Sequence, residues 1–130
     1  VGELPAYAIN RLYNRCQSCH SLDGTTGTGP SFKGLWTRVK SGDVVFTTGE
    51  RLSDLYGENT TYEVPENYIR TSIVNPQGHI VQGYLGSMPS FQGQLKDKQI
   101  TAMIEMFKHL DELTDDEGNI TVNPDGAPRQ

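Results

Sequence analysis

The sequence predicts an all-α fold. Apolar side chains recur at helical spacing in residues 4–16, in residues 65–75 and in the segment that ends at Leu110, and glycine-rich stretches separate these segments. The chain has 130 residues, which fits one small domain. Only 35% of the residues are hydrophobic, so we expect a large buried cofactor to supply part of the core.

The first predicted helix ends in a cluster of potential ligands. Pro5 suits its first turn, and its apolar face consists of Leu4, Ala8, Ile9, Leu12, Tyr13 and Cys16. Cys16, Cys19 and His20 follow the same spacing at i, i+3 and i+4. Their side chains point to one side if the helix continues or if a tight turn follows it.

Two glycine-rich stretches, residues 21–36 and residues 76–95, are expected to be loops, and the first is expected to wrap around another group. Between them, residues 43–64 contain two β-prone runs at 44–48 and 60–64. These runs predict a small β-pair around a helical turn at 51–56.

The two later helices have marked boundaries. Pro65 and Pro76 delimit the middle helix, whose buried stripe is predicted to be Tyr68, Ile69, Ser72 and Ile73. The stripe of the last helix is predicted to be Ile100, Met103, Ile104, Phe107 and Leu110, and Met106 is expected to point away from it. Lys96 stands where a capping side chain would be expected, so Asp97 is predicted to cap one residue later.

The net charge of −5 arises in the C-terminal segment. Residues 1–110 hold ten acidic and ten basic side chains, whereas residues 111–130 hold six acids and Arg129. We therefore predict a neutral domain at 1–110 and an acidic tail or linker at 111–130. The absence of a basic cluster argues against nucleic-acid binding. No apolar run reaches the length of about 18 residues that a membrane span needs, so membrane contact is expected only through an anchor or a parent subunit outside this sequence.

Residues 15–20 read Arg-Cys-Gln-Ser-Cys-His and contain the only two cysteines. Cys-x-x-Cys-His is the attachment signal for c-type haem, in which the thiols add to the porphyrin vinyl groups and the histidine binds iron. Three other interpretations remain open: a redox dithiol, half of a zinc site, and chance. A redox dithiol usually follows a strand, and a zinc site lacks a second cysteine pair here. His79 and His109 offer no zinc-finger spacing and are expected to be exposed to solvent.

The sixth ligand of a haem iron distinguishes an electron carrier from a haem enzyme. Met88 lies in the glycine-rich stretch YLGSMPSFQG, where Pro89 stiffens the backbone, so Met88 is the predicted axial ligand. Met103 and Met106 lie in the last helix and are expected to pack or to lie at the surface.

The motifs CQSCH, GPS at 29–31 and SMPSF at 87–91, followed by an amphipathic helix, resemble class I monohaem cytochrome c. The wider pattern YIRTSIVNPQGHIVQGYLGSMPSFQGQL is most similar to the cytochrome c domain fused to subunit II of some haem-copper oxidases, and to monohaem subunits of related respiratory complexes. The resemblance covers residues 5–110. It implies a cytochrome c fold, with crossing N- and C-terminal helices and loops that wrap the haem.

The resemblance also implies how one covalent haem c is held. Cys16 and Cys19 form the thioether bonds, and His20 and Met88 bind the iron. The carbonyl of Pro30 accepts a hydrogen bond from the outer nitrogen of His20, which fixes the ring and raises its basicity.

Four further residues complete the site that the resemblance implies. Arg38 pairs with a haem propionate, the alternative being a surface arginine. Trp36 and Tyr68 belong to the shell on the propionate side. Tyr84 either hydrogen-bonds near the methionine sulfur or packs.

The resemblance implies a one-electron carrier rather than an enzyme. We expect it to be a monomer that meets redox protein partners of a bacterial respiratory chain, in the periplasm or on the outer face of the cytoplasmic membrane, and to deliver electrons to or within a terminal oxidase. The alternatives are a free periplasmic shuttle and a monohaem subunit of a quinol-oxidising complex. A haem enzyme or a ligand-binding sensor would need an open or displaceable position where Met88 is predicted.

Overall fold

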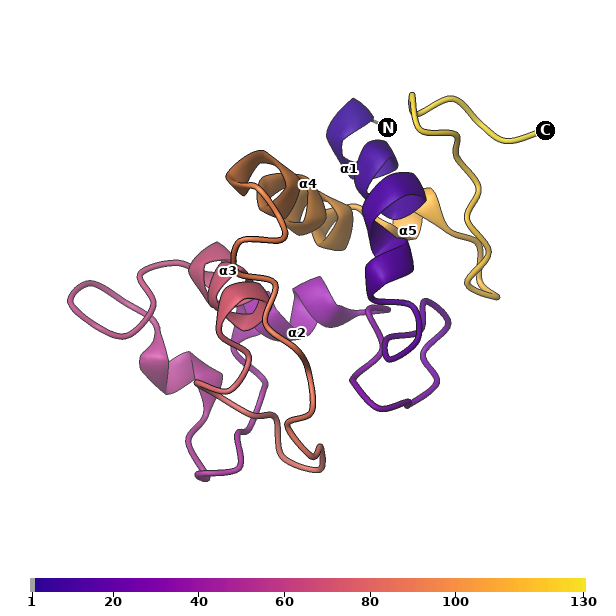
Figure 1. Ribbon diagram of the computed structural model, residues 1–130. Coiled ribbons are helices and arrows are strands. Elements are labelled where there is room, and N and C mark those ends of the chain that lie inside the picture. The colour runs from indigo at the N-terminus through magenta and orange to yellow at the C-terminus, as the bar shows by residue number, and fades with distance from the viewer. Residues whose placement is uncertain (1) are drawn as a thin grey trace. The chain divides into compact units, whose positions relative to one another are not determined.

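The computed structural model describes residues 2–130, and the regular secondary structure of these residues is helical. The α-helices are α1 (Glu3–Tyr7), α2 (Leu35–Ser41), α3 (Pro65–Val74), α4 (Asp97–Lys108) and α5 (Leu110–Leu113) (Figure 1). Within residues 2–130 the only β-type pairing is a set of isolated bridges, so no sheet is formed. The prediction of an all-α fold is confirmed. No helix in this part of the chain combines the length and apolarity needed to cross a membrane.

The chain divides into two compact units. The first, called the terminal unit, consists of the N-terminal residues up to Leu35 together with Lys96–Gln130. The second, called the central unit, is Trp36–Leu95. Each unit is described separately.

The N-terminal helical segment of the terminal unit changes its helix type along its length. After α1, a π-helical turn at Ala8–Leu12 and a 3₁₀ turn at Tyr13–Arg15 continue the same segment. The predicted helix is thus confirmed, but Leu4 is 48% exposed although it was expected on the buried face. A π turn adds one residue to a helical turn, so the residues before it rotate relative to those after it. Pro5 and Ala6 are buried instead.

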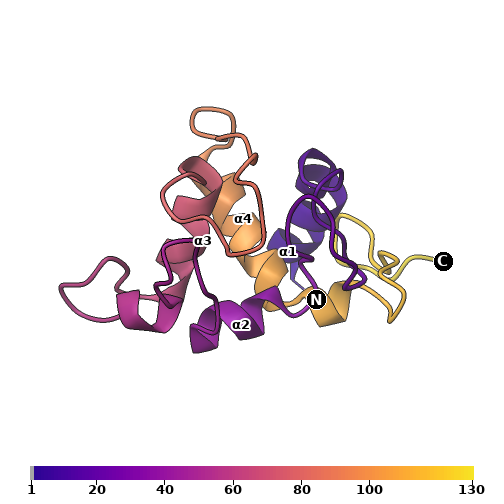
Figure 2. The ribbon, with the colours of Figure 1, turned by 90° about the horizontal axis from the view of Figure 1, so that it is seen from below.

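Helix α4 packs against α1 and the π turn, and the two segments cross (Figure 2). The predicted stripe of Ile100, Met103, Ile104, Phe107 and Leu110 is buried. The expectation that Met106 points away from the core is wrong, because Met106 is fully buried. Ala102 lies one helical turn before it and is also fully buried, so α4 is covered on a second side.

The start of α4 differs from the prediction. Lys96 is the residue before the first turn, and Asp97 is already helical. The side chain of Gln99 reaches back, and its Oε1 accepts the backbone N–H of Lys96 at 2.9 Å. Asp97 is therefore not the capping residue. The backbone N–H of Lys96, which has no partner within the helix, is bonded instead by the glutamine in the third helical position.

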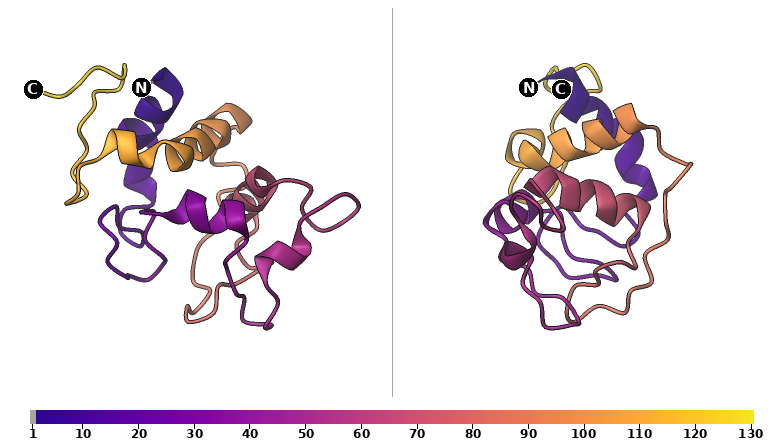
Figure 3. Two further views of the ribbon diagram at one scale, coloured as in Figure 1. Left: turned by 180° about the vertical axis from the view of Figure 1, so that it is seen from behind. Right: turned by 90° about the vertical axis from the view of Figure 1, so that its left-hand side faces the viewer.

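Residues 110–130 contribute buried side chains to the terminal unit. Leu113 is fully buried and Val122 is 5% exposed. Antiparallel bridges join Thr114 to Ile120 and Val122 to Pro128, which fold this segment into two turns. The segment runs beside the N-terminal helix (Figure 3).

The β-pair expected in the central unit is not formed as predicted. Residues 44–48 and 60–64 do not pair with each other; Val45 bridges to Arg51, Phe46 to Val81 and Tyr62 to Tyr56. The chain reverses immediately after Phe46, where the N–H of Phe46 donates to Glu50 O at 2.9 Å and that of Gly49 donates to Phe46 O at 2.9 Å. Such local turns use the hydrogen-bonding groups that a longer pairing would need. The predicted helical turn is present as a 3₁₀ helix at Leu52–Leu55.

Helix α3 begins at Pro65 as predicted, and Tyr68, Ile69 and Ile73 of its predicted stripe are buried. Ser72, the fourth member of that stripe, is only half-buried. The central unit also contains an aromatic cluster, whose members are Phe46, Tyr62, Tyr68 and the half-buried His79. The expectation that His79 is exposed is wrong. Its ring lies 4.9 Å from that of Phe46, and its Nδ1 is hydrogen-bonded to the hydroxyl of Tyr62 at 2.9 Å.

Candidate haem-binding site

Cys16, Cys19 and His20 share one tight turn at the end of the N-terminal helical segment. The N–H groups of Cys19 and His20 both donate to Cys16 O, at 3.1 Å and 2.9 Å. The N–H of Cys16 donates to Tyr13 O at 2.8 Å, and the hydroxyl of Tyr13 donates to the carbonyl of His20. The turn therefore continues the helical spacing on which the sequence prediction depended.

The two thiols are free and half-buried. Burial raises the pKa of Cys16 to about 11, the neighbouring Cys19 also raises it, and the charge of Arg15 opposes both. A redox dithiol needs a lowered pKa, because the thiolate is the reactive form. Residues 2–130 also contain no group of three Cys, His, Asp or Glu side chains placed to hold a metal ion. The structure therefore supports neither the dithiol nor the zinc interpretation.

The imidazole of His20 is oriented by a backbone carbonyl. Its Nδ1 lies 2.7 Å from Pro30 O. A carbonyl only accepts hydrogen bonds, so Nδ1 carries the proton and Nε2 keeps its lone pair. Burial lowers the pKa of His20, and the bond to Pro30 opposes this shift. A neutral imidazole with a free Nε2 is the form that binds iron.

Gly29 leaves room for this ring. A Cβ atom at Gly29 would lie 2.4 Å from Cε1 of His20 and 2.8 Å from its Nδ1. The N–H of Gly29 donates to Cys19 O at 2.9 Å, which ties the loop to the cysteine turn. The backbone of Gly29 therefore lies directly against the imidazole, and no other residue type fits there unless the ring moves.

Met88 lies half-buried in the central unit, in a loop anchored at several points. The side-chain amide of Gln77 donates to Gly86 O and, at 3.4 Å, to Met88 O. On the other side of Met88, the hydroxyl of Ser90 donates to Val74 O at 2.6 Å. These bonds tie the backbone of Met88 to the end of α3. Gln77 and Ser90 were not predicted as site residues, because bonds from a side chain to a distant carbonyl leave no spacing pattern in the sequence.

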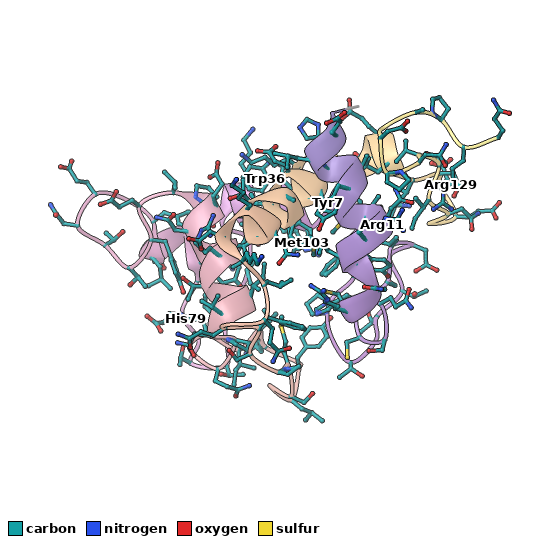
Figure 4. All side chains as sticks on the ribbon, turned by 45° about the horizontal axis from the view of Figure 1, so that its top comes forward. Tyr7, Arg11, Trp36, His79, Met103 and Arg129 are labelled. Carbon is teal, nitrogen blue, oxygen red and sulfur yellow. The ribbon has the colours of Figure 1, made fainter. Side chains whose placement is uncertain are left out.

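The remaining predicted site residues also lie in the central unit. Trp36 (Figure 4) and Arg38 belong to α2 and are half-buried. Tyr84 is half-buried in the loop before Met88. Tyr68 is buried in the aromatic cluster, and burial raises its pKa. The terminal unit thus contains the two thiols, His20 and the carbonyl of Pro30 that accepts its hydrogen bond. The central unit collects the predicted methionine and the polar shell, whose roles stay predictions.

A family model of cytochrome c matches residues 7–111. The chain belongs to the cytochrome c family. A comparison with curated protein sequences gives no match. Membership makes this cytochrome c a haem-binding electron carrier, and its cofactor is covalent haem c.

The residues of the terminal unit fit that cofactor. Two free thiols stand three residues apart in one turn, and the neutral imidazole beside them has only Nε2 available. When bound, haem c supplies a centre that changes its oxidation state by one electron. Cys16 and Cys19 are the two cysteines available for its covalent attachment.

Proposed function

We propose that this cytochrome c carries single electrons within a bacterial respiratory chain, to or within a terminal oxidase, with His20 and Met88 as the axial ligands of its iron. The observation that carries the proposal is the hydrogen bond between His20 Nδ1 and Pro30 O, at 2.7 Å. Because Nδ1 holds the proton of this bond, Nε2 is the ring nitrogen whose lone pair can bind iron. The similarity of residues 68–95 to oxidase-fused cytochrome domains supports the respiratory role.

The residues of the chain would set the redox properties in two ways. The carbonyl of Pro30 holds the proton of His20 at Nδ1 and raises the basicity of Nε2. The thioether of Met88 is a soft, uncharged ligand, which favours ferrous iron and so raises the reduction potential. Because Gln77 and Ser90 fix the backbone around Met88, the thioether would stay in place when other molecules approach.

Carbon monoxide separates a carrier from a ligand-binding sensor or a haem enzyme. We expect the reduced protein at neutral pH to leave carbon monoxide unbound, as judged from an unchanged visible spectrum. Prompt binding would favour the sensor or the enzyme and would contradict the carrier.

We propose that the partner is a redox protein that docks with little help from charge. The segment from Pro76 to Leu95, which contains Met88, has no acidic or basic side chain other than His79. Arg11, Arg15 and Lys33 are the basic residues nearest to the cysteine turn in sequence, and Lys33 donates to Asp116 O at 3.4 Å. Docking would therefore depend on a small apolar contact, and such contacts are weakly screened by salt.

The partner proposal is tested by the ionic-strength dependence of electron transfer to bacterial membranes that contain a haem-copper oxidase. We expect the rate to change little between low and moderate salt. A steep fall would contradict an uncharged docking surface, provided that it persists in a variant with Asp111, Asp116 and Glu117 changed to their amides.

We further propose that the protein is a monomer, in the periplasm or on the outer face of the cytoplasmic membrane.

A further inference from the structure

The imidazole of His20 is stacked on the ring of Phe32. The two ring centroids lie 4.5 Å apart and the ring planes meet at 15°. Phe32 is buried, with 6% of its surface exposed. Rotation of the imidazole about its Cβ–Cγ bond would drive an edge of the ring into the phenyl face, so the stack restricts that rotation.

Phe32 is itself held in place. Phe107 meets it edge-on at a centroid distance of 4.7 Å and an angle of 76°, and Tyr13 lies 5.9 Å away at 61°. The N–H of Phe32 donates to Ser21 O at 2.8 Å, and its carbonyl accepts from the N–H of Leu35 at 3.0 Å. The phenyl ring is therefore a fixed support for the imidazole.

The stack and the hydrogen bond constrain different motions of His20. The bond from Nδ1 to Pro30 O fixes one edge of the ring but permits tilting about the line of that bond. A ring packed flat against one face removes this tilt. Pro30 therefore sets which nitrogen is free, whereas Phe32 sets the plane in which that nitrogen lies.

We propose that Phe32 is a positioning residue that sets the plane of the His20 imidazole, and with it the electronic asymmetry of the iron that Nε2 binds. This inference rests on the proposed ligand role of His20. The interaction acts on ring orientation alone, so neither haem attachment nor ligation requires it.

The test compares four ferric proteins with attached haem by electron paramagnetic resonance: the unchanged chain, Phe32→Leu, Phe32→Tyr and Leu113→Ala. Leucine at position 32 keeps an apolar group but removes the stack, whereas tyrosine keeps the aromatic face. Leu113→Ala is the control, because it removes fully buried apolar volume from the same unit and leaves the rings around His20 unchanged. Phe32→Met replaces Phe32→Leu if the leucine variant does not fold.

We expect Phe32→Leu to remain low-spin but to shift and broaden its g values, and Phe32→Tyr to restore those of the unchanged chain. Leu113→Ala should lower the melting temperature while leaving the g values in place. Unchanged g values in a low-spin Phe32→Leu protein would overturn the inference. An equal shift in Leu113→Ala would also overturn it, since general packing would then explain the effect. Absence of any low-spin signal in the unchanged chain would instead refute the proposed ligands.

Discussion

At the scale of single residues, His20 is the most constrained side chain of the site. Pro30 bonds its Nδ1, Phe32 stacks on its ring, and Gly29 leaves no free space beside its Cε1. The hydroxyl of Tyr13 also holds its carbonyl. The Cys-x-x-Cys-His motif predicted His20, and the resemblance to cytochrome c implied Pro30. Neither predicted Phe32 or Tyr13, because their contacts depend on how the loop folds back.

We predict that Gly29→Ala displaces the imidazole of His20. The added Cβ would lie 2.4 Å from Cε1 of His20, so either the loop or the ring must move. Overpacking of this kind costs about 1–3 kcal/mol. We expect a lower melting temperature and an altered spectrum of the ferric protein. Gly2→Ala is the control, since a Cβ there meets only Pro5 at an ordinary 3.8 Å. Identical spectra and melting temperatures for the two variants would refute the prediction.

At the scale of elements, residues 110–130 lie along the N-terminal helical segment and are called the strap. The side-chain amide of Asn10, in the π turn, donates to Ala6 O at 2.9 Å and to Val122 O at 3.0 Å, and its Oδ1 accepts from Arg129 at 2.6 Å. Arg129 also donates to Val122 O from Nε at 3.0 Å. The acidic composition of residues 111–130 predicted a tail or linker and gave no sign of this network, because its bonds join residues at opposite ends of the chain.

We predict that Arg129→Ala loosens this strap. The variant loses hydrogen bonds from a charged group to Asn10 and to Val122 O, which are worth roughly 1.5–3 kcal/mol together. The melting temperature of the protein with attached haem should fall by several degrees. Arg11→Ala is the matched control: Arg11 belongs to the same π turn but is exposed (Figure 4). Equal melting temperatures for the two variants would show that the strap contributes nothing.

At the scale of the whole molecule, the helices and the cysteine turn were predicted well, because each follows from a local spacing pattern in the sequence. Contacts between distant segments were not predicted. Helical spacing located α3, α4 and the N-terminal segment, and the Cys-x-x-Cys-His motif located the cysteine turn. The β-pair, the exposure of His79 and the orientation of Met106 were predicted wrongly. Each depends on which surfaces meet after folding, and local spacing does not contain that information.

Covalent haem attachment is predicted to be a condition of folding. Only 35% of the residues are hydrophobic, which leaves a small domain with little apolar area to bury. The double variant Cys16→Ala, Cys19→Ala should therefore lack a cooperative thermal transition and should have weak helical circular dichroism. Phe46→Leu, which alters the core without touching attachment, should still melt cooperatively. A helical double variant with a sharp transition would show that the chain folds without its cofactor.

The central claim is that this cytochrome c carries electrons at an iron bound by His20 and Met88. The visible spectrum of the ferric protein tests it most directly, because a weak far-red band marks the bond between a thioether and ferric iron. We predict that the unchanged chain and Met103→Ala show this band, and that Met88→Ala loses it together with a fall in reduction potential. A high-spin spectrum of the unchanged chain, or loss of the band in Met103→Ala but not in Met88→Ala, would contradict the claim.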